Sequence, residues 1–403
     1  MIDYSSADRP IISCVAPDSA GQLLTIHKSR PTWAEINLDN LAHNLRVMRE
    51  LVGPGVAVMC AIKADAYGHG AIGCARALEK AGVDWFGVAL PEEGKRLREH
   101  GINTPVLCLG GFWEGQEELV ISQNLTTAAF RIDQLRSLDR VAGEFGRIGY
   151  YHLKVDTGMG RLGVPFADLG AFLDAAEGLN NLKLDGVMTH LASADVPELT
   201  DFTNSQIQLF GEAVSAVANR GHNPAWIHAA NSAATLAYPE SRGNLVRLGG
   251  ALYGVWRDTV DPRFASVDLR PAMSLRSRVM LLKTYPSGAR IGYGCTFTTE
   301  RESLIATVPI GYSDGLRRSL SSGGFVLVKG QAAPIAGRVS MDLTNIDVTD
   351  IPDVSVGDEV VIIGSQGARS ITAEDIAAKH HGISYEVTCA LSDRIPRIYV
   401  SSR

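Results

Sequence analysis

The chain has 403 residues, of which 45% are hydrophobic, and a formal net charge of -6 at pH 7. This length predicts one large core and a second, smaller one, which excludes a small disulfide scaffold. The acidic balance provides no general basic field for nucleic acid or for an anionic membrane, so a small-molecule partner is favoured.

Residues 1–30 are predicted to be an N-terminal extension. Their early acidic residues and short apolar run differ from the basic start and apolar centre of a secretory signal. No stretch of the chain approaches the roughly 18 to 20 apolar residues of a membrane-spanning helix. The six cysteines are scattered without a C-x-x-C pair, which is typical of reduced thiols rather than of disulfides or a zinc site. We therefore expect a soluble, cytoplasmic protein without a metal.

Eight short apolar runs, separated mostly by helical patterns, fill much of residues 31–260. Apolar runs without alternation predict parallel strands that are buried on both faces, and eight of them with intervening helices predict a (β/α)8 barrel. The runs are VAVMCAI (56–62), WFGVAL (85–90), PVLCLG (105–110), TTAAF (126–130), YYHLKVD (150–156), KLDGVMTHL (183–191), AWIHAA (225–230) and LVRLGGALYG (245–254).

Start and stop signals for a helix are legible in residues 91–101. Pro91 suits a first turn, two glutamates follow it, and Gly101 can end the helix after its basic residues. From residue 261 on, strand-like segments broken by Gly-Asp and Gly-Ser signals predict a separate, mostly β domain over residues 261–403. A short helix within residues 371–381 is expected before the last strand.

Lys63 follows the first apolar run, on the barrel face where catalytic groups usually lie. Burial there can lower the pKa of the ammonium group and release an amine that reacts with an aldehyde cofactor. A salt bridge from Lys63 to Asp65 at the barrel rim is the structural alternative, and this residue alone leaves both readings open.

A phosphate site is suggested by the last two barrel loops, which commonly build such sites. Ser232 offers a hydroxyl and a backbone N–H in one loop, and Gly249 and Gly250 offer unobstructed amides in the next. Tyr67, which is followed by two nearby glycines, could hydrogen-bond the same anion, although a lone tyrosine is more often packed in a core.

Three basic residues belong to the fifth and eighth units. Lys154 lies in the fifth run and Arg161 in the glycine-rich segment after it, where a guanidinium suits a carboxylate; pairing with Asp156 is the structural alternative. Arg247 lies inside the eighth apolar run, and a charge in that setting is seldom buried without a designated partner. We therefore favour a functional role for Arg247.

The second domain carries tyrosines in glycine-rich turns. Taken by themselves these residues indicate structure rather than chemistry, because nothing in the pattern brings them to the barrel mouth. They are Tyr293, Tyr312 and Tyr385, accompanied by Met341 and Asp342.

Nine segments in unbroken order resemble the alanine racemase family over residues 30–403: AIKADAYGHG, KVDTGMGRLG, THLASAD, HAANSAAT, LVRLGGALYG, IGYGCTF, PIGYSDGLRR, GRVSMD and YEVTCALSDRIPR. The resemblance implies a (β/α)8 barrel that binds pyridoxal 5'-phosphate, followed by a smaller β domain. It also implies a homodimer whose active sites combine the barrel of one subunit with the second domain of the other. The implied reaction interconverts L- and D-alanine, supplying D-alanine for bacterial peptidoglycan.

The resemblance assigns roles to individual residues. Lys63 would hold the cofactor and act as one base, and Tyr293 from the other subunit would be the opposing base. Arg247 would face the pyridine nitrogen, with His190 linking Tyr293 to Arg247. The cofactor phosphate would be held by Tyr67, Ser232, Gly249, Gly250 and Tyr385. Substrate would be bound or approached by Arg161, Met341, Tyr312 and Asp342. Lys154 matches a position that some members carry as a carbamate.

Three alternatives stay open beside this reading. The substrate could be another amino acid such as serine, since one methylene is worth only about 1 to 3 kcal/mol in a pocket. A related barrel decarboxylase should lack the Tyr-Gly motif at Tyr293. A pyridoxal-phosphate carrier protein would consist of the barrel alone, so the second domain disfavours it.

Overall fold

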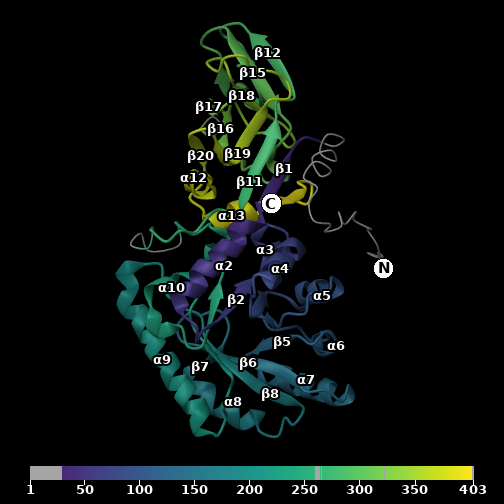
Figure 1. The fold of residues 1–403 in the computed structure, drawn as a ribbon, viewed down its shortest axis with the longest axis vertical. Helices are drawn as coiled ribbons and strands as arrows, with labels where there is room; N and C mark the ends of the chain where they lie inside the picture. Colours follow the sequence, from purple (N-terminus) through teal and green to yellow (C-terminus); the bar gives the residue numbers. More distant parts are fainter. Residues whose placement is uncertain (1–29, 259–263, 265, 322, 402–403) are drawn as a thin grey trace.

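The computed structural model describes residues 30–401 except 259–263, 265 and 322. The predicted extension, residues 1–30, therefore lies outside the described residues apart from Arg30. Figure 1 shows an elongated molecule with a strand-and-helix barrel at one end and a mostly β domain at the other. In the described part of the chain, no helix is both long and apolar enough to cross a membrane.

Eight parallel strands form a nearly closed barrel in the described chain, and each of the eight predicted runs overlaps one of them. Backbone hydrogen bonds from Asn244 to Ile227 (3.1 Å) and from Arg247 to Ala230 (3.0 Å) join the last strand to the one before it. The strands are β2 (Ala57–Ala61), β3 (Trp85–Val88), β4 (Val106–Cys108), β5 (Thr126–Ala129), β6 (Gly149–Asp156), β8 (Leu182–Met188), β9 (Trp226–His228) and β10 (Leu245–Leu248).

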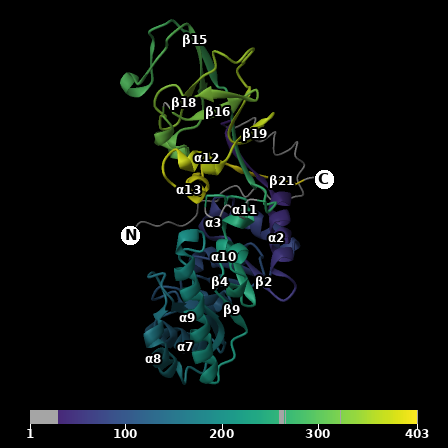
Figure 2. The same ribbon diagram turned by 90° about the vertical axis from the view of Figure 1, so that its left-hand side faces the viewer.

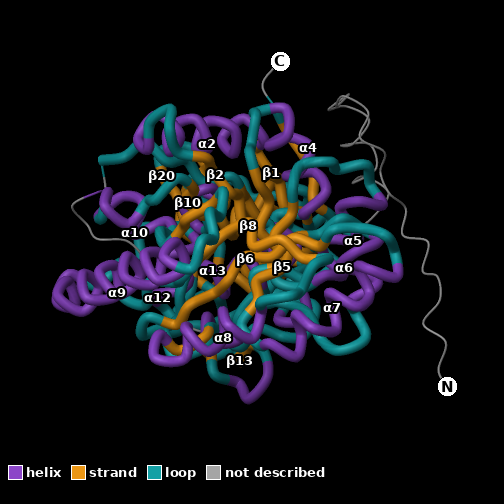
Figure 3. Tube along the Cα trace, turned by 90° about the horizontal axis from the view of Figure 1, so that it is seen from below, coloured by secondary structure: helices purple, strands orange, loops and turns teal. Residues whose placement is uncertain are grey.

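Helices surround these strands, as Figure 3 shows from below. In α2, Leu41, Leu45 and Met48 recur at helical spacing and are fully buried against the barrel. The helices are α2 (Leu38–Val52), α4 (Ala71–Lys80), α5 (Pro91–Glu99), α6 (Glu117–Ser122), α7 (Ile132–Glu144), α8 (Leu169–Ala176), α9 (Thr200–Asn219), α10 (Ser232–Ala237) and α11 (Gly250–Tyr253). The predicted helix at residues 91–101 is confirmed, with Pro91 in its first turn and Gly101 at a φ of 77° just past its end.

The eighth run differs from its prediction in one respect. Residues 245–254 are expected to be strand-like throughout, but the strand ends at Leu248 and α11 begins at Gly250. Gly249 leaves the extended conformation, with φ -108° and ψ -111°, and this turns the chain back across the barrel mouth. A two-residue strand, β7 (Val164–Pro165), pairs with the end of β6.

The second domain is mostly β, as predicted, and its main sheet has the strand order β17-β16-β19-β11-β1-β21. Its elements are β11 (Met273–Arg278), β12 (Leu281–Tyr285), β13 (Arg290–Ile291), β14 (Phe297–Thr298), β15 (Ser303–Val308), β16 (Phe325–Val328), β17 (Gln331–Pro334), β18 (Thr344–Asp347), β19 (Glu359–Gln366), β20 (Arg369–Ile371), α12 (Ala373–Ala378), α13 (Ser384–Cys389) and β21 (Arg397–Val400).

β1 (Trp33–Asn37) joins the two domains. It precedes α2 in the sequence and falls inside the segment 31–260 predicted for the barrel, yet it pairs with β11 and β21 of the second sheet. The described part of the chain thus contributes its first strand to the second domain, then builds the barrel and returns to the second domain. The predicted boundary near residue 260 falls among residues 259–263, which the structure does not describe.

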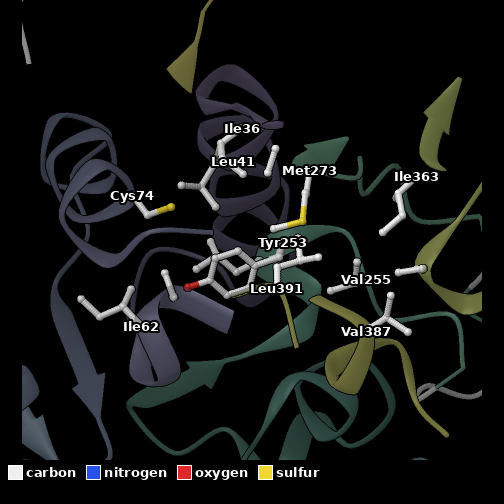
Figure 4. Close-up of a cluster of buried hydrophobic side chains, with 14 of the residues drawn as sticks. Ile36, Leu41, Ile62, Cys74, Tyr253, Val255, Met273, Ile363, Val387 and Leu391 are labelled. Carbon is white, nitrogen blue, oxygen red and sulfur yellow. The ribbon is translucent and has the colours of Figure 1, made fainter. Parts of the chain in front are cut away.

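A continuous apolar core connects the barrel to the second sheet. Figure 4 shows Tyr253 at its centre, with Met273 from β11 beside it and Val387 from α13 nearby. The buried Tyr253 hydroxyl donates to the carbonyl oxygen of Ala61 at 2.8 Å. Figure 2 shows α13 next to α3 (Lys63–Tyr67) and α11 at the top of the barrel. The core therefore holds one helix of the second domain against the barrel mouth.

Candidate active site

Alternation along the barrel strands decides which polar side chains enter the barrel. The odd-numbered β2 residue Met59 lies in the cluster that fills the barrel with Trp85 and Leu107, while its neighbours Val58 and Cys60 face the helices. The same rule places four basic side chains inside, and all four are buried. They are His152 and Lys154 of β6, His228 of β9 and Arg247 of β10.

Lys63 begins α3 (Lys63–Tyr67), a single turn with an unusual backbone. Ala64, Asp65, Ala66 and Tyr67 all have positive φ, between 50° and 57°, a left-handed conformation that costs about 1–2 kcal/mol for each non-glycine residue. Tertiary contacts hold the turn: the Ala64 amide donates to Glu93 Oε1 at 2.7 Å, and Ala71 N donates to Asp65 Oδ1 at 2.9 Å. The turn directs Lys63 and Tyr67 to the barrel mouth.

The structure does not show the salt bridge that was the alternative reading of Lys63. Asp65 instead pairs with Arg96, at 3.2 Å. Burial lowers the pKa of Lys63, and the positive charge of Arg161 lowers it further, while Glu93 opposes the shift. Because both leading causes disfavour the ammonium ion, the side chain is poised to react as a free amine.

Five predicted phosphate-binding residues converge beside this turn. The Gly249 amide donates to Ser232 Oγ at 2.8 Å, and a β-carbon on Gly249 would lie 2.7 Å from the Tyr67 hydroxyl. A β-carbon on Gly250 would lie 2.2 Å from the Tyr385 hydroxyl. Hydroxyl groups and unobstructed amides around one point are the donors that phosphate needs.

Tyr385 reaches this point within one chain, because α13 packs on α3. A β-carbon on Gly68 would lie 2.1 Å from the carbonyl oxygen of Thr388, so the two backbones are in direct contact. The rings of Tyr67 and Tyr385 meet edge to face with centroids 5.4 Å apart. The sequence alone gave no reason to bring a second-domain tyrosine to the barrel.

Arg247 is buried and held by acceptors from two neighbouring strands and loops. Nη1 donates to His228 Nδ1 (2.9 Å), and Nη2 donates to the carbonyl oxygens of Thr189 (2.8 Å) and Ala229 (2.9 Å) and to His190 Nδ1 (3.3 Å). No described residue accepts from Nε–H of Arg247, so that donor is free for a ligand. The contact with His190 forms one half of the predicted link to Tyr293.

The barrel mouth carries an excess of positive charge. The buried Lys154 has a pKa lowered to about 8 by burial and by the charges of Arg247, Arg161 and Lys63. The alternative pairing of Arg161 is absent from the described contacts, because Asp156 Oδ1 accepts from the amides of Gly158 and Gly160 (3.0 and 3.1 Å). A cluster of positive groups suits a ligand that carries several negative charges.

The remaining predicted residues lie together on the second domain but not at the barrel mouth of the same chain. Tyr293, in the turn between β13 and β14, is 71% exposed and makes no hydrogen bond or ring contact with a described residue. Tyr312 and Met341 are also exposed, and Ser313 N donates to the Met341 carbonyl at 3.0 Å. Asp342 pairs with Arg394 at 2.7 Å.

The sequence analysis missed three residues around Lys63 and Arg247. Glu93, which sequence suggested only as a helix-start residue, holds the turn of Lys63, and this depends on a contact between distant segments. His152 and His228 lie next to Arg247 in the barrel. Strand alternation could have found both histidines, because His152 is two residues before Lys154 and His228 occupies the equivalent inward face of β9.

Comparison with known proteins agrees with both halves of this architecture. Residues 36–256 match the family model "Alanine racemase, N-terminal domain", and residues 272–399 match "Alanine racemase, C-terminal domain". A protein of Sorangium cellulosum described as alanine racemase is 46% identical over 384 residues, covering 92% of this chain and 99% of that protein.

Solved structures give the same result. The alanine racemase of Streptomyces lavendulae superposes with a TM-score of 0.86 at 37% identity, covering 93% of this chain and 98% of that chain. The alanine racemase of Bartonella henselae, whose structure has covalently bound pyridoxal phosphate, superposes with a TM-score of 0.82 at 27% identity, covering 92% of this chain and 100% of that chain.

Proposed function

This chain belongs to the alanine racemase family and is an amino-acid racemase, and from that premise we propose that it interconverts L- and D-alanine with two opposed bases. One base is Lys63, and the other is Tyr293 of the partner subunit in a homodimer. The observation that carries the proposal is Lys63, whose pKa is lowered by burial and by the charge of Arg161, close to the point where Tyr67, Gly249, Gly250 and Tyr385 converge.

The residues at the barrel mouth fit pyridoxal phosphate. Arg247 would present its free Nε–H to the pyridine nitrogen, and because arginine only donates, that nitrogen would stay unprotonated. When bound, the cofactor supplies an aldehyde for the Lys63 amine and a sink for the electron pair left at Cα. The phosphate would be held by Tyr67, Ser232, Gly249, Gly250 and Tyr385.

Racemisation requires a proton to leave one face of Cα and another to arrive on the opposite face. Lys63 Nζ serves one face, taking the proton of the D-enantiomer, and the phenol oxygen of Tyr293 of the partner subunit serves the other. His190 Nδ1 accepts from Arg247 at 3.3 Å, so its other nitrogen is the one available to the incoming tyrosine. Burial and the charge of Arg247 lower the pKa of His190 to about 2, which keeps its ring neutral.

The substrate carboxylate is bound between the two subunits. Arg161 approaches it from the barrel loop, and the Met341 amide, which no described residue accepts from, approaches it from the partner. Tyr312 and Asp342 would line the path of the substrate. The exposure of Tyr293, Tyr312 and Met341 in one chain supports this assignment, because a partner barrel would cover them.

We also propose that Lys154 carries a carbamate. Its pKa of about 8 gives it a larger neutral fraction near neutral pH than an ordinary lysine has, and that amine can attack carbon dioxide, forming an N–C bond and releasing one proton. The product is an anion beside the positive charges of Arg247 and Arg161, so the local charge becomes more balanced. The carbamate would orient Arg161, whose charge already acts on Lys154.

A turnover experiment tests the proposed function. Purified protein with pyridoxal phosphate should convert L-alanine to D-alanine, with L-serine and L-lysine assayed beside it to define the substrate range. Release of carbon dioxide without any D-product would overturn the proposal in favour of a decarboxylase. A cytoplasmic location and a role in supplying D-alanine for peptidoglycan stay predictions.

A further inference from the structure

A chain of buried polar groups runs from Arg247 toward the floor of the barrel. Arg247 Nη1 lies 2.9 Å from His228 Nδ1, and His228 Nε2 lies 2.8 Å from His152 Nδ1. His152 Nε2 is buried and hydrogen-bonds to no described residue. It lies 4.0 Å from Asp185 Oδ2, on the neighbouring strand β8.

The proton positions along this chain follow from one chemical fact, which is that arginine has donors and no acceptor. His228 Nδ1 must therefore be unprotonated, and a neutral His228 carries its proton on Nε2. That proton needs an acceptor, so His152 Nδ1 is also unprotonated and the His152 proton lies on Nε2. Every group in the chain thus donates in the same direction, away from Arg247 and toward Asp185.

Both imidazoles are neutral in this environment. Burial lowers the pKa of His152 to about 3 and the pKa of His228 well below its ordinary value, with Arg247 adding to both shifts. The cation at one end is also fully buried and has no carboxylate within 4 Å among the described residues. A buried charge is costly without compensation. The carboxylate of Asp185, at the far end of the hydrogen-bonded series, would compensate the charge of Arg247.

The barrel leaves room for the buried polar groups between Arg247 and Asp185. A β-carbon on Gly186 would lie 2.7 Å from His152 Nδ1, so only glycine at this strand position leaves room for the ring. The β6–β8 register shifts between Tyr151 and His152, where the ring enters the barrel. Trp85 packs against His152 with ring centroids 5.5 Å apart, which excludes water from one side.

We propose that His152 and Asp185 are positioning residues for Arg247: Asp185 accepts the Nε2 proton of His152, directly or through one water molecule, and thereby stabilises the two histidine tautomers that Arg247 requires and the orientation of the guanidinium. The pair touches neither substrate nor cofactor. Its consequence for catalysis rests on the proposed function, since Arg247 acts there on the cofactor ring. The arrangement of protons does not depend on that function.

The test compares two variants that both remove the Asp185 charge. The Asn carbonyl oxygen of Asp185→Asn can still accept from His152, whereas the side chain of Asp185→Leu cannot. Asp174→Leu, at an exposed position of α8, is the matched control. The first readout is nitrogen NMR of ring-labelled histidines in cofactor-free protein, with His152 and His228 assigned by single substitutions to glutamine.

We expect Nε2–H tautomers for both histidines in the wild type, in Asp185→Asn and in the control, and a changed tautomer ratio in Asp185→Leu. In the cofactor-loaded enzyme, Asp185→Leu should lower kcat roughly tenfold in both directions of racemisation with little change in the KM for alanine. Wild-type tautomers that differ from Nε2–H, or tautomers unmoved in Asp185→Leu, would overturn the proposal. A wild-type protein without racemase activity would instead contradict the proposed function, and the NMR result would still test the arrangement of protons.

Discussion

The hydroxyl oxygen of Tyr67 lies 2.7 Å from the position that a β-carbon on Gly249 would occupy. This spacing sets the Tyr67 hydroxyl directly beside the backbone of Gly249, whose amide donates to Ser232 Oγ at 2.8 Å. A methyl group at residue 249 would displace the tyrosine, and Tyr67 cannot move freely because it packs against the rings of Tyr253 and Tyr385. The geometry of the cradle therefore depends on this glycine.

We expect Gly249→Ala to raise the Kd for pyridoxal phosphate roughly tenfold, which corresponds to about 1.4 kcal/mol. Titration of cofactor-free protein, followed by absorbance, measures this directly. Gly211→Ala is the control, because Gly211 lies on the exposed face of α9 with nothing within 4 Å of the added carbon. Equal affinities for the two variants would show that the cradle does not bind the phosphate.

Attachment of the cofactor should depend on pH through Lys63. Its pKa is lowered by burial and then by Arg161, and only the neutral amine, present above that pKa, attacks the aldehyde. Attachment should therefore slow as the pH falls through the pKa of Lys63. Arg161→Gln removes one cause of the shift, so its profile should move to higher pH.

The measurement is the rate at which covalently bound cofactor appears in cofactor-free protein across a pH series. Arg136→Gln, at an exposed position of α7, is the control and should follow the wild-type profile. If the pH profile of Arg161→Gln superimposed on that of the wild type, the charge of Arg161 would not be lowering the pKa of Lys63.

Lys154 should take up labelled carbon from bicarbonate. Because the neutral amine reacts, uptake should increase as the pH rises through about 8, the pKa of Lys154. Carbon NMR of the protein in isotopically labelled bicarbonate should show one carbamate signal that is lost in Lys154→Ala and kept in Lys80→Ala, an exposed control. A spectrum without this signal, or one that persists in Lys154→Ala, would refute the modification.

Tyr293→Phe removes the phenol oxygen and leaves the ring. We expect L-to-D turnover to fall by about 10²- to 10⁴-fold, the usual contribution of a positioned acid or base, while cofactor binding is unchanged. Tyr150→Phe, another exposed tyrosine, should behave as the wild type. Comparable losses of turnover in the two variants would mean that the phenol oxygen of Tyr293 does not act as a base.

The fold was largely predictable because the barrel strands are continuous apolar runs separated by helices. The places where prediction fell short depend on contacts between distant segments. Ala64, Asp65 and Ala66 favour right-handed backbone locally, so their left-handed turn becomes visible only with Glu93 in place. The place of β1 in the second sheet could not be predicted, because its partners, β11 and β21, come more than 200 residues later in the sequence.

The candidate site was predictable to a different degree. Strand position places Lys63, Lys154 and Arg247 in or just after barrel strands, but from the residues themselves only Arg247, a charge inside an apolar run, favoured a functional role. The second-domain residues carry no such signal. Tyr385 meets the barrel through the packing of α13, and Tyr293 is exposed at 71% in the single chain, so its assignment depends on an assembly that one sequence does not display.

Subunit mixing tests the shared active site most directly. Lys63→Ala and Tyr293→Phe proteins should each be nearly inactive, and when they exchange subunits, each mixed dimer would contain one site with both bases intact. By the symmetry of a dimer, random exchange should restore about a quarter of wild-type activity. If mixed dimers, isolated by a different affinity tag on each variant, gained no activity over the parents, Lys63 and Tyr293 would not be bases from opposite subunits.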